Sequence, residues 1–227
     1  MTPAEFYASP LHHPGLLLGG AALSALGLAL ATRGERPWGS PFLRAWAWVF
    51  TVEILLDATL TSNLSPLRPW PGVERAFAIA FVILGDLRAF ALLDRFSRPE
   101  RPAAASLARS VAWAFAASLV VAAATQLWPG YFSNPRRTFL LYEDLSLAIF
   151  TGRFLALRAA PVEDDTRRWL RAVAGYFVVQ YALWAASDAL ILAGVELAYY
   201  LRVAPNLLYY AGFVTFATLR APARLRR

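Results

Sequence analysis

Six carboxylic acids and two arginines lie inside long apolar stretches of the sequence. The acids are Glu53, Asp57, Asp86, Glu143, Asp144 and Asp188, and the arginines are Arg88 and Arg153. A charge at the centre of a membrane-spanning helix costs about 2.5–3.5 kcal/mol on insertion scales, so such side chains must be paired, hydrated or kept neutral. Carboxylates in these positions mark proton and ion pathways, which makes these residues the candidate functional site.

The spacing of four of the acids indicates which of them act together. Glu53 and Asp57 are four residues apart and would share one face of a helix. Two carboxylates so close together in an apolar environment are not expected to be ionised at once without a cation. Glu143 and Asp144 are adjacent and would point about 100° apart on a helix, so only one of them is expected to face the interior.

The expected depth of the polar residues separates them into an outer and an inner group. The outer group consists of Glu53, Asp57, Glu143, Asp144 and Asp188, and the inner group of Arg88 and Arg153. This pattern predicts an acid-lined cavity that opens outward and is closed on its inner side by ion-pairing or gating arginines. The preferred ion pair is Asp86 with Arg153, and a contact between Arg88 and Glu53 is a second one.

The last apolar stretch adds uncharged polar groups to this expected cavity. Asn206, Tyr209 and Tyr210 lie in its outer part. The set of residues expected to bind an ion or ligand is therefore Glu53, Asp57, Asp86, Asp144, Asp188, Asn206 and Tyr209.

Seven apolar stretches must position these residues, and together they predict an all-α, polytopic membrane bundle. Each is close to the length of about 20 residues that a helix needs to cross a bilayer. Prolines and glycines separate them, and the connection from Gly194 to Tyr199 is the least clearly marked. The predicted spans are Gly15–Thr32, Phe42–Ser62, Val73–Arg95, Leu107–Trp128, Thr138–Arg158, Trp169–Gly194 and Tyr199–Arg220. Because they fill the chain, one domain is expected over residues 1–227.

The composition agrees with a membrane protein and explains the basic charge. The chain is 58% hydrophobic and 16% charged, whereas soluble domains are about 45–50% apolar and about 25% charged. Fifteen of the 22 basic residues fall in connections on one side and five on the other, which predicts an external N-terminus and a cytoplasmic C-terminus. We therefore expect a multi-pass protein of the plasma or bacterial inner membrane, with the lipid bilayer and not nucleic acid as its partner.

The residue types that are absent exclude several kinds of site. Without lysine, no retinal Schiff base can form, and without cysteine no zinc site of the usual nitrogen and sulfur kind is available. His12 and His13 are the only histidines, and they are adjacent and precede the first predicted span. They cannot supply axial haem ligands from two facing helices. We expect no cofactor and assign no metal site, so the chemistry must use carboxylates, arginine, hydroxyls and the backbone.

Two dipeptides, Gly85-Asp86 and Ser187-Asp188, lie about a hundred residues apart and resemble the acidic pair of lysoplasmalogenase-like membrane enzymes. The stretch from Asn206 to Ala211 is similar to the polar-aromatic part of that family's last helix. The resemblance implies hydrolysis of a lipid vinyl-ether bond, with Asp86 and Asp188 as acid and base. The chain departs from the family because it lacks the extra helix and the histidine-bearing motif after the first aspartate.

The sequence leaves three functions open. The preferred one is binding or transport of a proton, a cation or a small cationic solute in the acid-lined cavity. The second is an intramembrane lipid hydrolase that uses paired aspartates. The third is a non-catalytic membrane subunit or receptor-like bundle, in which the charged residues serve assembly. The chain is small for a monomeric carrier, which favours a homo-oligomer or a membrane partner subunit.

Overall fold

The computed structural model describes residues 1–33 and 39–226, and every regular element among them is a helix. The chain forms two compact units: unit 1 comprises Met1–Arg88 with Asn206–Arg227, and unit 2 comprises Ala89–Pro205. Both boundaries fall within helices, namely α4 (Pro71–Ser97) and α8 (Ala198–Leu207). The single domain stays a prediction. Arg36 and Arg227, which contributed to the predicted orientation, lie outside the described residues.

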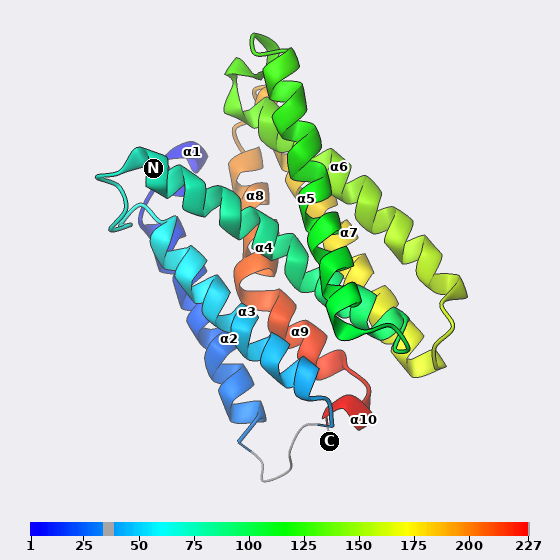
Figure 1. Cartoon of the computed structure of the whole chain (residues 1–227). Coiled ribbons are helices and arrows are strands. Elements are labelled where there is room, and N and C mark those ends of the chain that lie inside the picture. The colour runs from blue at the N-terminus through cyan, green and yellow to red at the C-terminus, as the bar shows by residue number, and fades with distance from the viewer. Residues whose placement is uncertain (34–38, 227) are drawn as a thin grey trace. The chain divides into compact units, whose positions relative to one another are not determined.

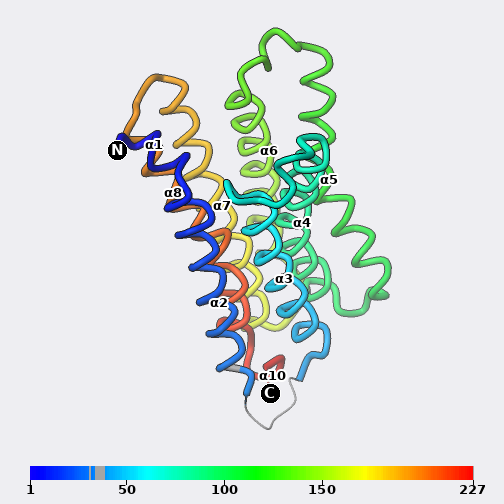
Figure 2. The backbone as a smooth tube through the Cα atoms, turned by 90° about the vertical axis from the view of Figure 1, so that its left-hand side faces the viewer, coloured from blue at the N-terminus to red at the C-terminus, as the bar shows by residue number. Residues whose placement is uncertain are grey.

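Unit 1 joins the N-terminal helices to the C-terminal ones. Besides the first part of α4 it contains α1 (Pro3–Tyr7), η1 (Leu11–Leu16), α2 (Leu17–Ala31), α3 (Pro41–Leu60), η4 (Leu208–Gly212), α9 (Phe213–Arg220) and α10 (Ala223–Arg226). Although far apart in the sequence, α2, α3 and α9 pack against one another (Figures 1 and 2). Their contact surfaces bury Leu28, Leu43, Ala47, Phe213 and Ala217, so the apolar side chains of these helices form the core of the unit.

Unit 2 is organised around the long helical hairpin of α6 (Pro135–Ala156) and α7 (Asp164–Leu192). It also contains the end of α4, most of α8, α5 (Ala103–Leu127), η2 (Tyr131–Ser133) and η3 (Leu157–Ala159). The ring of Phe150 stacks on those of Phe90 and Phe177, with centroid distances of 4.6 Å in both pairs. Phe150 and Phe177 are fully buried, so this aromatic stack links α4, α6 and α7 in the core.

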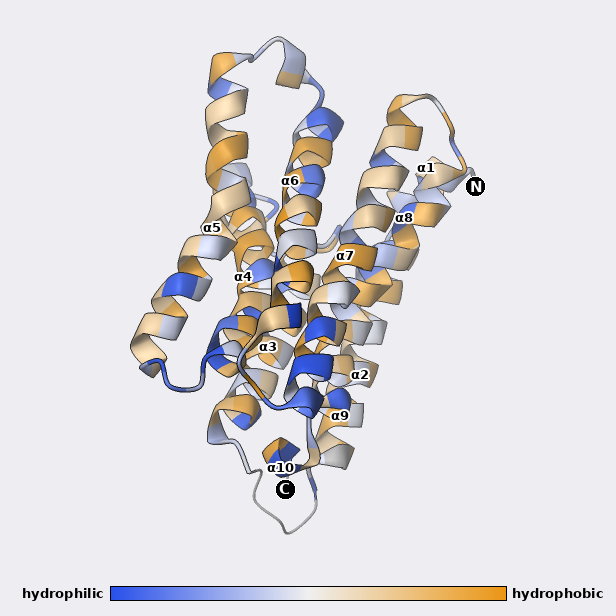
Figure 3. Ribbon diagram, turned by 90° about the vertical axis from the view of Figure 1, so that its right-hand side faces the viewer, coloured by the Kyte–Doolittle hydropathy of each residue, from blue (hydrophilic) through white to orange (hydrophobic). Residues whose placement is uncertain are grey.

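Four helical segments are long and apolar enough to cross a membrane: Leu11–Leu30, Pro71–Ser97, Ala103–Leu127 and Asp164–Leu192. Helices also form at the other three predicted spans, but every 18-residue stretch of α3 and of α6 holds at least three charged residues, and the last span is divided by the π-helical turn η4. The all-helical fold is thereby confirmed, whereas seven spans and their orientation stay predictions. Large apolar side chains of α5, including Leu107, Phe115 and Leu119, are exposed. The ribbon of this helix is coloured hydrophobic over much of its length in Figure 3, as a helix long enough to span the apolar core of a bilayer would be.

At the connection that the sequence marks least clearly, α7 ends in a sharp stop before α8. Gly194 has a φ of 84°, a left-handed conformation that suits glycine. The amide of Val195 donates to the carbonyl oxygen of Leu190 at 2.9 Å, and that of Gly194 donates to Ile191 at 3.0 Å. These two bonds form a Schellman motif, which satisfies the last carbonyl groups of α7 and ends the helix.

Substitution Gly194→Ala should lower the free energy of unfolding by about 1–2 kcal/mol, because a Cβ atom disfavours the left-handed conformation. No other atom lies within 4 Å of the added Cβ, so the loss reports backbone conformation alone. Thermal unfolding in detergent measures it. The control Gly152→Ala adds a Cβ in open space within α6 and should leave stability unchanged or higher; equal effects of the two substitutions would contradict the explanation.

Candidate functional site

Glu53 and Asp57 share the buried face of α3, as their spacing predicts. Their exposed fractions are 6% and 4%. Asp57 accepts a hydrogen bond of 2.9 Å from the Thr61 hydroxyl, and the hydroxyl groups of Tyr209 and Tyr210 lie close to the same carboxyl group. Neither carboxyl oxygen of Glu53 has a hydrogen-bond partner among the described residues. Glu53 is therefore a buried acid whose polar atoms the fold leaves unsatisfied.

Arg88 lies fully buried in unit 1 and is held by an aromatic ring rather than by an acid. Its guanidinium carbon lies 3.9 Å from the ring centroid of Tyr209, a cation–π arrangement. None of its three guanidinium nitrogens has a hydrogen-bond partner in the described part of the chain. The positive charge acts on both Glu53 and Asp57. The predicted Arg88–Glu53 contact thus takes the form of a charge interaction without a hydrogen bond.

Gly85 allows Tyr209 to reach this position. The Tyr209 hydroxyl donates a hydrogen bond of 3.0 Å to the carbonyl oxygen of Phe81 on α4. A Cβ atom on Gly85 would lie 2.6 Å from the Tyr209 ring and 2.7 Å from its hydroxyl, which is closer than van der Waals contact permits. The glycine of the Gly85-Asp86 dipeptide therefore has a packing role, and Asp86 beside it is 2% exposed.

The two histidines occupy a different place from the one expected. They lie within the candidate span Leu11–Leu30, and His12 is only 3% exposed. Its Nδ1 lies 3.0 Å from the carbonyl oxygen of Tyr7, and its Nε2 lies 3.3 Å from Nδ2 of Asn206. His13 Nε2 lies 3.2 Å from the carbonyl oxygen of Ala58 on α3. The two histidines were expected to precede the first span, whereas this candidate span includes both of them, and they contact polar backbone and amide groups of unit 1.

In unit 2 two arginines neutralise the buried acids. Arg202 Nη1 donates to Glu143 at 3.0 Å and lies 2.5 Å from the carboxylate of Asp188. Arg136 Nη1 donates to the same Asp188 oxygen at 2.8 Å. Both arginines were expected in external connections, yet Arg202 is only 8% exposed. The excess of buried acid over arginine is therefore smaller than the sequence suggested, and in this cluster two acids meet two cations.

The adjacent acids on α6 point in different directions, as expected. Glu143 faces the interior and joins the Arg202 cluster, whereas Asp144 is exposed. Asp144 was the one assigned to the binding site, and the structure gives Glu143 the buried position. The helix phase of α6 is set by its packing on α7, which the local sequence does not reveal.

Arg153, the second expected gating residue, pairs with Asp94 near the end of α4, an acid that was not among the expected site residues. Its guanidinium donates to the carboxylate of Asp94, which is 2% exposed, and Arg109 Nε lies 3.4 Å from the same oxygen. Ser110 also donates to Asp94 at 3.3 Å. Asp86 belongs to unit 1 and Arg153 to unit 2, so the predicted Asp86–Arg153 pair stays a prediction.

These contacts define what each unit can do chemically. Among the described residues of unit 1, Glu53 and Asp57 are buried with one buried guanidinium, that of Arg88, and neither carboxyl oxygen of Glu53 has a hydrogen-bond partner. Unit 2 fixes its buried acids in ion pairs. Within residues 1–33 and 39–226, no group of three or more histidines, aspartates or glutamates is placed to hold a metal ion.

Substitution Gly85→Ala should destabilise unit 1 through the clash with Tyr209, and the melting temperature in detergent should fall. The control Gly27→Ala adds a Cβ in open space within α2 and should not lower it. Truncation of the ring removes the clash, so Tyr209→Ala should reduce the additional cost of Gly85→Ala in a double-mutant cycle. Strict additivity of the two substitutions would contradict the proposed contact.

Substitution Arg202→Gln should lower the free energy of unfolding by about 3–5 kcal/mol, because it leaves two buried carboxylates short of a cation. The control Asp164→Asn breaks the surface pair with Arg167, in which Asp164 is 76% exposed. That change should cost less than about 1 kcal/mol. Chemical denaturation in mixed micelles compares the two variants, and a small loss for Arg202→Gln would show that the cluster is solvated.

No family model, no curated protein and no solved structure matches the sequence. The likeness of Gly85-Asp86 and Ser187-Asp188 to lysoplasmalogenase-like enzymes therefore stays an expectation. The chemistry of the chain follows from the contacts of its buried groups within each unit.

Proposed function

We propose that the protein is a multi-pass membrane protein that binds a proton, or a small cation in its place, at the buried carboxyl groups of unit 1 and carries it through the bilayer. The support is the imbalance of buried charge. Among the described residues of unit 1, Glu53 and Asp57 are buried on one face of α3 with one buried arginine, Arg88, acting on both, and a surplus of negative charge in an apolar environment requires a bound positive charge.

Glu53 carries the proposal. Its carboxyl group is 6% exposed and neither oxygen has a hydrogen-bond partner among the described residues. A naked carboxylate in this environment is costly, and a proton or a cation bound to it removes that cost. Arg88 is close enough to act on Glu53 electrostatically, yet it stacks on Tyr209 and forms no hydrogen bond with the acid. The acid therefore has no hydrogen-bonded cation among the described residues, and a mobile positive charge can take that role.

Asp57 provides a second step for the proton. It lies one helical turn from Glu53, which corresponds to about 6 Å along the axis of α3. Asp57 accepts a hydrogen bond from the hydroxyl group of Thr61, which directly follows Leu60, the last residue of α3. Two acids on one face, followed by a hydroxyl group at the helix end, form a short relay between the interior of unit 1 and its surface.

The contacts of unit 2 bear on the other two functions, the lipid hydrolase and the non-catalytic membrane subunit. The lipid hydrolase would use Asp188 as an acid or base, but one oxygen of this carboxylate is already bound by both Arg202 and Arg136. The same ion pairs are what a purely structural network would contain. They fit the role of a scaffold that fixes α6, α7 and α8.

Substitution Glu53→Gln should abolish proton flux in liposomes loaded with a pH-sensitive dye, because the amide keeps the shape of the side chain but cannot take up the proton. Flux should fall to the level of protein-free liposomes. The control Asp144→Asn makes the same change at an exposed acid and should leave flux unchanged.

The thermal unfolding of each variant shows whether it is folded, and Glu53→Asp tests the need for an ionisable group. Retained flux in Glu53→Asp with lost flux in Glu53→Gln is the expected result. A folded Glu53→Gln variant that conducts protons like the wild type would overturn the proposal.

A further inference from the structure

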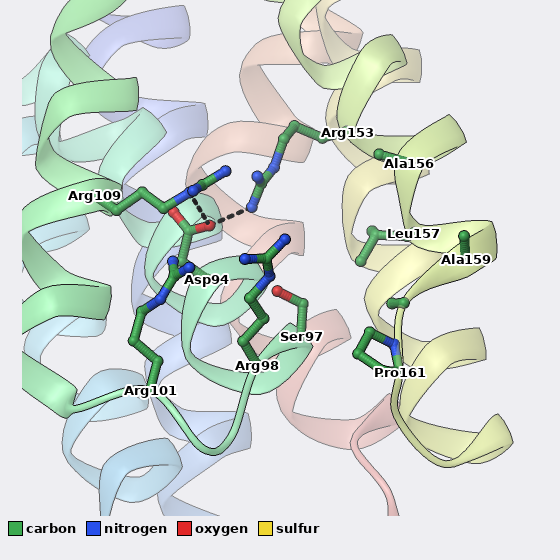
Figure 4. Close-up of a pocket in the computed structure, with 11 residues that line it drawn as sticks. Asp94, Ser97, Arg98, Arg101, Arg109, Arg153, Ala156, Leu157, Ala159 and Pro161 are labelled. Atoms are coloured by element: carbon green, nitrogen blue, oxygen red, sulfur yellow. Dashed lines mark hydrogen bonds and ion pairs between the residues drawn. The ribbon is translucent and has the colours of Figure 1, made fainter.

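A cavity at one end of unit 2 is lined by four arginines. It encloses about 290 Å³ and lies among the end of α4, the start of α5 and the α6–η3 segment. Figure 4 shows the guanidinium groups of Arg98, Arg101, Arg109 and Arg153 directed toward one space, with Asp94 between them. This cavity plays no part in the proposed proton site, since all of its lining residues belong to unit 2.

The cavity has a large excess of positive charge. Asp94 is the one acid in its lining, and it is engaged by Arg153 and lies 3.4 Å from Arg109. The Nε atoms of both arginines are buried without a hydrogen-bond partner in the described part of the chain. Arg109 is thus within ion-pair distance of Asp94, but its Nε–H is not aimed at the carboxylate. Donor groups of these arginines remain available for a second anion.

Arg98 and Arg101 have no acid of their own. Among the described residues, neither guanidinium group forms a hydrogen bond or an ion pair. Both residues lie in the short connection from α4 to α5, whose backbone turn is closed by a hydrogen bond from the Arg101 amide to the Arg98 carbonyl oxygen at 3.1 Å. This turn directs two unpaired cations toward the Asp94 end of the cavity (Figure 4).

The chemistry of the lining selects a phosphate group. Guanidinium groups bind phosphate oxygens through paired N–H donors, and several around one cavity match an anion with several oxygens. The opposite wall is apolar, formed by Ala156, Leu157 and Pro161. A ligand that fits both surfaces has a phosphate beside hydrocarbon, which is the composition of a phospholipid at the level of its headgroup.

The position of the cavity favours the same ligand. It lies where the candidate spans Pro71–Ser97 and Ala103–Leu127 end and begin, which is the depth of the headgroups in a bilayer. On α5, Leu107 and Val111, two residues before and after Arg109, expose their side chains. We propose that this cavity binds the phosphate group of an anionic phospholipid. Basic pockets between membrane helices are suited to anionic headgroups.

The test measures lipid retention by native mass spectrometry of the full-length protein from vesicles of equal parts phosphatidylglycerol and phosphatidylcholine. The wild type should retain phosphatidylglycerol in preference to phosphatidylcholine. The double variant Arg98→Gln/Arg101→Gln should lose this preference. The control Arg158→Gln/Arg168→Gln removes the same charge from two exposed arginines of unit 2 outside the cavity and should retain it.

A second arm measures inorganic phosphate binding by calorimetry in a neutral detergent, which distinguishes a lipid from a soluble phosphate. Phosphate binding that is lost in Arg98→Gln/Arg101→Gln, without any preference between the lipids, would keep the phosphate site but overturn its assignment to a phospholipid. Equal lipid retention by the wild type and this double variant, with no phosphate binding to either, would overturn the proposal entirely. Unfolding temperatures of both double variants confirm that the comparison is between folded proteins.

Discussion

The need to neutralise charge among apolar helices governs both units of this protein, and the two units meet it in different ways. In unit 2 the buried carboxylates are matched by arginines: Glu143 and Asp188 bind Arg202, and Asp94 binds Arg153. In the described part of unit 1, the buried Arg88 stacks on Tyr209 and forms no hydrogen bond with Glu53. Because transfer of a lone carboxylate from water to an apolar interior is costly, the unmatched acid of unit 1 is where a proton or cation gains most by binding.

Close helix packing holds this unmatched arrangement in place. The indole Nε1–H of Trp46 donates a hydrogen bond of 2.8 Å to the carbonyl oxygen of Arg88 and so ties α3, which carries Glu53, to α4. Gly85 lets the Tyr209 ring lie against α4, where the ring covers one face of the guanidinium. The helix that carries Glu53 is thus held by Trp46 and the guanidinium of Arg88 by Tyr209, without a hydrogen bond between the acid and the arginine. This separation distinguishes unit 1 from unit 2, where the acids and arginines hold one another.

The helices and one part of the site could be predicted from the sequence. Long apolar stretches bounded by proline and glycine placed a helix at each of the seven predicted positions, and the four-residue spacing placed Glu53 and Asp57 on one buried face. The inward direction of Arg136 and Arg202 could not be predicted, because an arginine near the end of an apolar stretch can extend either to the headgroups or to a buried acid. For the same reason, the pairing of Arg153 with Asp94 could not be predicted. The contacts of His12 with Tyr7 and Asn206 depend on tertiary packing, which the local sequence does not reveal.

Infrared difference spectroscopy of the protein in lipid nanodiscs tests the central claim most directly, because it detects protonation of individual carboxyl groups during a pH jump. If Glu53 is the proton-binding group, one carboxyl band of the wild type should disappear in Glu53→Gln. The same band should persist in Asp188→Asn, because the wild-type Asp188 carboxylate is paired with two arginines. A Glu53→Gln spectrum with every carboxyl band of the wild type would contradict the account.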